Sequence, residues 1–230
     1  MNNITSRKDL IRTLLILTFI YLFLQVFLIF VNDKNISRYF WLEHRDIKEL
    51  IDAGVPEKSG LTPIIKNISD NHFWLLRAGV ICTLILTFYY KDKNNDLYCL
   101  FKNITISAVL ILIIASGLVT WLLKIIVGKP RPGTKLEEYS AFNLSVKYYS
   151  FPSGHTSETF SYIIPFMFFI RKYYVIIILS IYGILAAFTR VVLAYHFFSD
   201  ILFSMYITSL LGWIICYYVE KKKVLGVADQ

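Results

Sequence analysis

Three long stretches with almost no charge constrain the fold of this chain more than any other feature. They cover residues 13–31, 104–123 and 201–219. A helix of about 20 apolar residues matches the roughly 30 Å hydrocarbon core of a bilayer. Hydrophobic residues make up 56% of the chain and charged residues 17%, whereas soluble domains carry about 25% charged residues. The sequence therefore predicts a polytopic membrane protein and excludes a soluble enzyme.

Three shorter apolar stretches complete a predicted all-α bundle of six transmembrane helices, which we expect to form one domain over residues 1–230. The expected spans are 13–31, 73–90, 104–123, 156–170, 173–189 and 201–219. The fourth is the weakest, because only residues 160–170 are continuously apolar. The first is longer than the core of a signal peptide and no small-residue cleavage site follows it, so we expect it to be a retained helix.

The basic residues indicate how the spans are oriented. Many of the 24 Lys and Arg residues lie in short segments beside the spans, where cytoplasmic loops concentrate positive charge. These are Arg7, Lys8, Arg12, Lys91, Lys93, Lys102, Arg171, Lys172, Lys221, Lys222 and Lys223. Both termini are therefore predicted to be cytoplasmic, with loops 32–72 and 128–151 outside. This distribution explains the net charge of +8 without nucleic acid, which we do not expect as a partner.

The outer loop 32–72 has a character of its own. Residues 39–42 are aromatic or aliphatic, and further apolar residues recur at helical spacing among charges. This pattern fits an amphipathic helix at the membrane surface as well as a solvated connector whose apolar face packs on the protein. As the largest outer segment, the loop is expected to select the substrate lipid. His44 and His72 are expected to be ordinary loop residues, and Arg77 to form a structural pair or to snorkel.

Polar and ionisable residues gather at the ends of three predicted spans, where charge beside a bilayer is expensive and calls for a reason. The groups are Lys124-x6-Arg131-Pro132, then Pro152-Ser153-Gly154-His155, then Thr189-Arg190 with His196 and Asp200. Counting spans from a cytoplasmic amino terminus places all three groups on the outer face of the membrane. The sequence thus predicts one site built from segments far apart in the chain.

The cations of these groups suit a phosphate. Lys124, Arg131 and Arg190 have no matching cluster of acids, and guanidinium and ammonium groups bind phosphate oxygens well. Ser153 and Gly154 before a helix offer a hydroxyl and backbone N–H groups at a helix amino terminus, which is a ready anion site. Each feature alone has a structural alternative, since a single Lys at a span end usually snorkels and Ser-Gly before a helix is usually a cap.

Two histidines supply a nucleophile and an acid. His196 and Asp200 are four residues apart, so on a helix they would share one face and the carboxylate could hold the imidazole tautomer. His196 would then attack phosphorus, and His155 would protonate the departing alkoxide. A His–Asp pair at this spacing is more often a structural hydrogen bond. The coincidence of three such groups on one face favours catalysis.

In order and spacing, the three motifs resemble the signature of the type 2 phosphatidic acid phosphatase superfamily over residues 104–219; Thr189 stands where the family usually has serine. The resemblance implies a six-helix bundle and a phosphatase that needs no metal or other cofactor and forms a phosphohistidine. It implies His196 as nucleophile, Asp200 as its partner, His155 as acid, and Lys124, Arg131, Ser153, Gly154 and Arg190 as phosphate ligands.

The predicted function is hydrolysis of a phosphomonoester or diphosphate of a membrane lipid at the outer face of a bacterial cytoplasmic membrane. A lipid A-type glycolipid and undecaprenyl diphosphate are the first candidates, followed by phosphatidylglycerol phosphate. A lipid-to-lipid phosphotransferase of the same fold is the main alternative. A non-catalytic lipid transporter fits less well, because its charges would lie near mid-membrane in broken helices. The three cysteines lack a CxxC spacing, so neither disulfides nor a zinc site is expected.

Overall fold

The computed structural model describes residues 6–31, 33, 35, 62–132 and 138–227. These residues form helices and connecting turns, with no β-strand in the described ranges, so the all-α prediction is confirmed. The α-helices are α1 (Arg7–Val31), α3 (Thr62–Tyr90), α4 (Asn95–Ile111), α5 (Thr120–Val127), α6 (Gly154–Ile170), α7 (Tyr173–Val192) and α8 (Phe198–Val227). A π-helical segment, η1 (Leu112–Val119), joins α4 to α5, and η2 (Val146–Tyr148) is a short 3₁₀ turn.

Five helical runs in the described ranges are long and apolar enough to cross a membrane. They are Arg7–Leu28, Ile64–Tyr90, Asn95–Val127, Tyr173–Val192 and Phe198–Lys221. Large side chains such as Phe19, Leu75 and Ile178 on these helices are exposed, as expected for surfaces that face lipid. Multiple membrane crossings are therefore supported, and five of the six predicted spans coincide with one of these helices.

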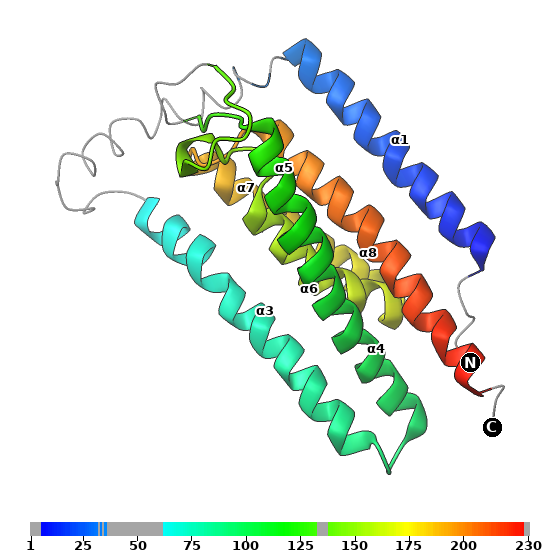
Figure 1. Cartoon of the computed structure of the whole chain (residues 1–230). Helices are drawn as coiled ribbons and strands as arrows, with labels where there is room; N and C mark the ends of the chain where they lie inside the picture. The colour runs from blue at the N-terminus through cyan, green and yellow to red at the C-terminus, as the bar shows by residue number, and fades with distance from the viewer. Residues whose placement is uncertain (1–5, 32, 34, 36–61, 133–137, 228–230) are drawn as a thin grey trace.

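The fourth predicted span, α6, is the centre of the bundle rather than a lipid-facing helix. It packs against α3, α4, α7 and α8, and most of its side chains are buried (Figure 1). Gly183 of α7 and Gly212 of α8 allow close packing, since an added Cβ would lie 2.7 Å from Ile163 and 3.0 Å from Ile164. The central position lets α6 carry buried polar residues such as Thr156, Ser157 and Ser161, because protein rather than lipid surrounds the helix.

The helix α3 begins about eleven residues before the predicted span 73–90. The predicted outer loop 32–72 includes residues 62–72, which the structure places in the first turns of α3. This part of the prediction was wrong because the hydropathy pattern counted only the mainly apolar portion of the helix, and the polar first turns were left out. The amphipathic stretch around residues 39–42, like His44, lies outside the described residues.

A π-helical segment sets the rotation of the helix that carries Lys124. The Oγ1 of Thr120 donates to the Ala115 carbonyl, five residues back, at 2.9 Å and to Ser157 Oγ of α6 at 3.1 Å. Residues four apart share a helix face, so the face of Thr120 that meets α6 also carries Lys124. Wide turns of this kind are frequent at functional sites.

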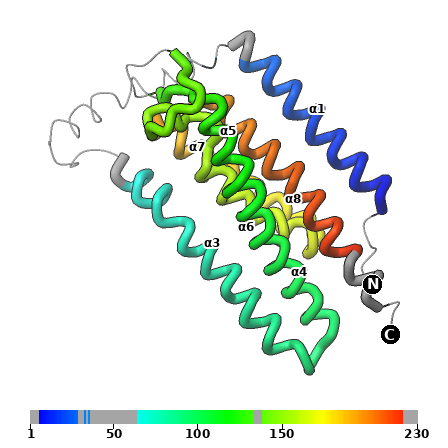
Figure 2. Tube along the Cα trace, in the orientation of Figure 1, coloured from blue at the N-terminus to red at the C-terminus, as the bar shows by residue number. Residues whose placement is uncertain are grey.

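The bundle has two distinct ends. The end of α5, the start of α6, the end of α7 and the start of α8 lie together at one end, and α1 begins and α8 ends at the other (Figure 1). The Cα trace in Figure 2 shows the same arrangement. The helices thus deliver all three polar motifs to the same end of the bundle.

Candidate active site

Backbone pairing joins the first motif to the segment just before the second. The Arg131 N–H donates to the Lys147 carbonyl at 2.9 Å, and the Ser150 N–H donates to the Lys129 carbonyl at 3.0 Å. Lys124 adds a side-chain link, since its Nζ donates to the Tyr149 carbonyl at 3.0 Å. These bonds hold the loop 128–132 beside the entry to α6.

The three predicted phosphate-binding cations surround this region. Arg131 and Arg190 both approach the ring of Tyr195, with guanidinium carbons 5.8 and 4.4 Å from its centroid. Arg190 is buried, and its Nη1 donates to Ser69 Oγ at 2.8 Å and to Asp70 Oδ1 at 3.3 Å. The structure therefore brings Arg131 and Arg190 together, as the sequence predicted.

The second motif forms the amino terminus of α6. Ser153 is the N-cap: its Oγ accepts from the Thr156 N–H at 3.4 Å, and its own N–H donates to Ser204 Oγ at 2.7 Å. Gly154 faces the third cation, because an added Cβ would lie 3.7 Å from Lys124 Cε and 4.0 Å from its Nζ. The helix terminus and Lys124 thus meet where the sequence predicted an anion site.

His196 and Asp200 do not share a helix face. The helix α7 ends at Val192 and α8 starts at Phe198, so His196 lies in the turn before the helix that carries Asp200. The Nδ1 of His196 lies 2.5 Å from the Ser150 carbonyl oxygen and 3.9 Å from Asp200 Oδ2. The predicted shared helix face is therefore wrong, and 3.9 Å is too long for a hydrogen bond between the two side chains in this structure; the role of Asp200 as partner of His196 stays a prediction.

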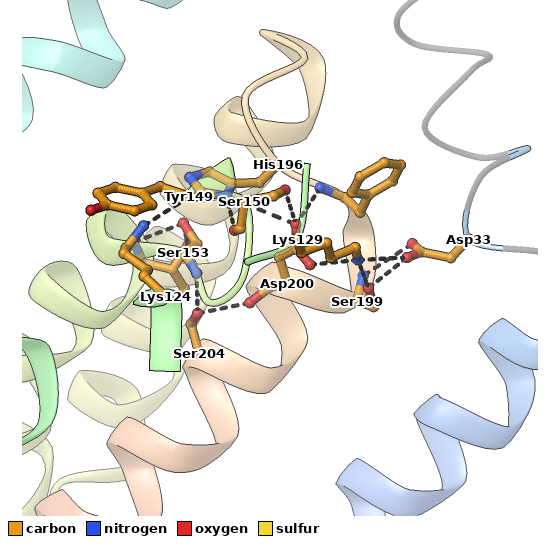
Figure 3. Close-up of polar contacts among 12 residues, drawn as sticks. Asp33, Lys124, Lys129, Tyr149, Ser150, Ser153, His196, Ser199, Asp200 and Ser204 are labelled. Carbon is orange, nitrogen blue, oxygen red and sulfur yellow. Dashed lines mark hydrogen bonds and ion pairs between the residues drawn. The ribbon is translucent and has the colours of Figure 1, made fainter. Parts of the chain in front are cut away.

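Asp200 instead anchors a buried polar network (Figure 3). Its side chain is fully buried and accepts from Ser150 Oγ at 2.5 Å, from the Phe197 N–H at 2.9 Å and from Lys129 Nζ at 2.7 Å. Asp33 lies 3.7 Å from the same ammonium group, and its carboxylate accepts from Ser199 Oγ at 2.5 Å. Two anions thus flank Lys129.

Burial and charge keep His196 neutral. The side chain is almost fully buried, and burial lowers the pKa of His196 well below its usual range. The cations Lys124, Arg131 and Arg190 lower it further, while the Ser150 carbonyl opposes them slightly. A neutral imidazole whose Nδ1 faces a carbonyl has its lone pair on Nε2, which is the form that a nucleophile requires.

The remaining predicted site residue, His155, lies in the first turn of α6. Its ring meets that of Phe73 of α3 edge-on, with centroids 5.2 Å apart. Its carbonyl accepts from Thr159 Oγ1 at 2.9 Å, and the same hydroxyl lies 3.0 Å from His72 Nε2. The catalytic role of His155, like the roles of the other site residues, stays a prediction.

Sequence reasoning missed the contribution of α3. His72 is a buried helical residue, not a loop residue, and its Nδ1 lies 2.9 Å from the Ser69 carbonyl. Ser69 and Asp70 contact Arg190 from the same turns. In the sequence, only the polar residues that precede the apolar stretch 73–90 could have indicated that α3 contributes to the site. The expected structural pairing of Arg77 is confirmed, since its Nη2 lies 2.8 Å from Glu158 Oε1.

Sequence reasoning also missed Lys129 and Ser150. Lys129 lies inside the first motif and Ser150 lies just before the second, but neither is one of the predicted site residues. Lys129 occupies one of the variable positions between Lys124 and Arg131, and Ser150 precedes Pro152 by two residues. A buried carboxylate generally needs a cation as partner. The prediction of Asp200 in the site could therefore have pointed to a nearby cation such as Lys129.

Comparisons with known proteins identify the family of this chain. The family model of the PAP2 superfamily matches residues 105–223. The fold is similar to a crystal structure described as the first transmembrane PAP2 type phosphatidylglycerolphosphate phosphatase from Bacillus subtilis, with a TM-score of 0.51 and 18% sequence identity over 90% of this chain and 96% of that one. A comparison with curated proteins finds no match. The family match spans all three motifs and more than half of the chain, so this protein belongs to the PAP2 superfamily and is a phosphoric ester hydrolase.

Proposed function

We propose that the protein is a metal-independent lipid phosphatase that acts through a phosphohistidine on His196. One observation carries the proposal: a buried, neutral imidazole lies with Nδ1 against a carbonyl oxygen, at the end of the bundle where Lys124, Arg131 and Arg190 gather. The Nε2 atom is the nucleophile in this scheme. The cations neutralise the phosphate, whose charge would otherwise repel the attacking lone pair.

The reaction proceeds in two displacements. In the first, His196 Nε2 forms a bond to phosphorus while the bond from phosphorus to the leaving oxygen breaks, and His155 gives its proton to that oxygen. In the second, the oxygen of a water molecule forms a bond to phosphorus while the bond from His196 Nε2 to phosphorus breaks, His155 takes up a proton of the water, and inorganic phosphate leaves. Lys124, Arg131 and Arg190, with Ser153 and Gly154 at the amino terminus of α6, hold the phosphate through both steps. Asp200 supports His196.

The membrane arrangement is part of the proposal. Residues 1–230 form one domain that crosses the membrane six times, with α6 as the central crossing. Both termini lie in the cytoplasm and the site opens at the outer face of a bacterial cytoplasmic membrane. The convergence of the motifs at the end of the bundle opposite the start of α1 supports this arrangement (Figure 1). Lipid headgroups reach such a site by lateral diffusion.

The substrate is a phosphomonoester or diphosphate of a membrane lipid. A lipid A-type glycolipid and undecaprenyl diphosphate are the first candidates. Phosphatidylglycerol phosphate joins them, because the structurally similar protein is described as a phosphatase for that lipid. Transfer of the phosphate to a second lipid remains the alternative, since a phosphohistidine can react with a lipid hydroxyl as well as with water.

Phosphate release by the purified protein from these three lipids tests the proposal. His196→Ala is expected to abolish release and leave the protein folded in detergent. Brief reaction of the wild type with ³²P-labelled lipid should yield a phosphoprotein that is stable to alkali and labile to acid, and His196→Ala should yield none. EDTA should leave the rate unchanged. Substantial turnover by His196→Ala would contradict the nucleophile assignment, and label that appears in a second lipid would identify a transferase.

A further inference from the structure

Every polar group of Ser150 takes part in the network around His196 (Figure 3). Its N–H donates to the Lys129 carbonyl at 3.0 Å, and its Oγ donates to Asp200 Oδ2 at 2.5 Å. Its carbonyl oxygen lies 2.5 Å from His196 Nδ1. The residue is fully buried, so none of these bonds competes with water.

The partner of Nδ1 decides the tautomer of His196. A carbonyl oxygen only accepts, so Nδ1 must carry the hydrogen and the lone pair must lie on Nε2. Asp200 Oδ2, at 3.9 Å, is too far away to play this part. Its oxygens are occupied by Ser150 Oγ, the Phe197 N–H and Lys129 Nζ. The carbonyl, not the carboxylate, holds the ring.

We propose that Ser150 is the positioning residue of His196, and that Asp200 acts on the nucleophile through the Ser150 hydroxyl. The Oγ–H bond to Asp200 fixes the peptide unit whose carbonyl orients the imidazole. Lys129, at 2.7 Å, supplies the counter-charge that keeps the Asp200 carboxylate an acceptor. This inference rests on the proposed function, in which His196 is the attacking group.

The histidine tautomer gives a direct test. The protein with ¹⁵N-labelled histidine in detergent is studied by NMR at pH 7.5, and the His196 signals are assigned by their loss in His196→Asn. Wild type should show His196 as the Nδ1–H tautomer. Ser150→Ala should show exchange between tautomers, whereas Ser150→Thr, which keeps the hydroxyl, should resemble wild type. A wild-type Nε2–H tautomer would overturn the proposal without any variant being needed.

A double-mutant cycle tests the route through Ser150. Ser150→Ala is expected to lower kcat about 10- to 100-fold, as loss of an outer partner does at other ordered sites, with KM little changed. The double variant Ser150→Ala/Asp200→Asn should be within about twofold of Asp200→Asn alone, because both changes break the same link. Losses that multiply in the double variant would show that Asp200 acts on His196 independently.

A matched control separates positioning from general damage to the core. Ser161 is equally buried in α6, and its Oγ donates to the Ser157 carbonyl at 2.8 Å, within the same helix. Ser161→Ala should leave kcat and the His196 tautomer unchanged. If His196→Ala itself retained turnover, the proposed function would fail. If His196 is essential but Ser150→Ala keeps the wild-type kcat, only the role of Ser150 is refuted.

Discussion

At the scale of single residues, the site contains a buried carboxylate, Asp200, whose charge is compensated by the ammonium group of Lys129 rather than by water. Asp200 is fully buried and Lys129 nearly so, at 12% side-chain exposure, with their charged atoms 2.7 Å apart. Asp33 reaches the same ammonium from the chain just beyond α1. A buried ion pair of this kind adds little net stability over apolar residues, but loss of one partner leaves an uncompensated charge.

Replacement of Lys129 should therefore be costly. Lys129→Met leaves Asp200 buried without its cation, and we expect the free energy of unfolding to fall by about 3–5 kcal/mol. Thermal unfolding in detergent, followed by circular dichroism, measures the change. Lys129→Arg should recover part of the loss, and Lys147→Met, at an exposed position, should change stability by less than about 0.5 kcal/mol. A wild-type melting temperature for Lys129→Met would refute the expectation.

The depressed pKa of His196 predicts the pH dependence of catalysis. The imidazole loses its Nε2 lone pair on protonation, so activity disappears as the pH falls through the pKa of the folded protein. Because burial and the surrounding cations lower this pKa, the acid limb of kcat/KM should lie below pH 6.5, the usual value for histidine.

Removal of Lys124, the first of the cations that lower the pKa of His196, tests whether charge contributes to the low pKa. Lys124→Met should raise the pKa of His196 and move the acid limb of the residual kcat/KM to higher pH. Arg77→Met removes a cation that pairs with Glu158 instead, and should leave the limb in place. An unmoved limb in Lys124→Met would show that the charge of Lys124 does not lower the pKa of His196. The measurement is the pH profile of phosphate release for the three proteins.

At the scale of elements, the turn that ends α5 connects two predicted phosphate-binding residues, Lys124 and Arg131. Gly128 is its C-cap with φ of 55°, in the left-handed region, and its N–H donates to the Lys124 carbonyl at 3.0 Å. Its own carbonyl accepts from the Ser140 N–H at 2.9 Å. The backbone of residues 140–141 packs so closely that an added Cβ would lie 1.9 Å from the Ser140 carbonyl oxygen.

Gly128→Ala should accordingly displace the loop that carries Arg131. We expect a loss of more than about 1 kcal/mol in stability and a fall in kcat/KM, because Arg131 no longer meets the phosphate. Gly79→Ala is the control, since an added Cβ there has nothing within 4 Å and alanine favours the helix by up to about 1 kcal/mol. Equal behaviour of the two variants in unfolding and phosphate-release assays would contradict the expected strain.

At the scale of the whole molecule, the bundle separates the end that carries the three polar motifs from an end where α1 begins and α8 ends (Figure 1). Arg171 and Lys172 follow α6 at the latter end, and Lys147 belongs to η2 at the end that carries the motifs. The positive-inside bias predicts that the end with Arg171 and Lys172 is cytoplasmic.

Cysteine labelling tests this orientation. In a background with Cys82, Cys99 and Cys216 replaced by alanine, Lys147→Cys should react with a membrane-impermeant maleimide in intact spheroplasts. Lys172→Cys should be protected until lysis. Both side chains are exposed in the structure, so a difference in labelling reports the side of the membrane rather than burial. The reverse pattern would place the site in the cytoplasm and change the pool of lipids it can reach.

The sequence by itself determined the class of fold and predicted the members of the site. A segment in lipid must be apolar for about 20 residues and satisfy its backbone internally, so five long spans are visible in composition alone. Phosphate binding needs particular residue types at helix ends, and this requirement led to the prediction of Lys124, Arg131, Ser153, Gly154 and Arg190. Their convergence followed from counting membrane crossings.

Only the tertiary structure decided which groups touch His196. The expectation that Asp200 orients it assumed one continuous helix, whereas the chain turns between α7 and α8. The carbonyl of Ser150 holds the ring instead, and a backbone carbonyl leaves no mark in the sequence because every residue has one. The central place of α6 and the contacts of Ser69 and His72 were hidden for a related reason. Polar residues inside a bundle are satisfied by neighbours distant in the chain, and hydropathy along the chain does not record those neighbours.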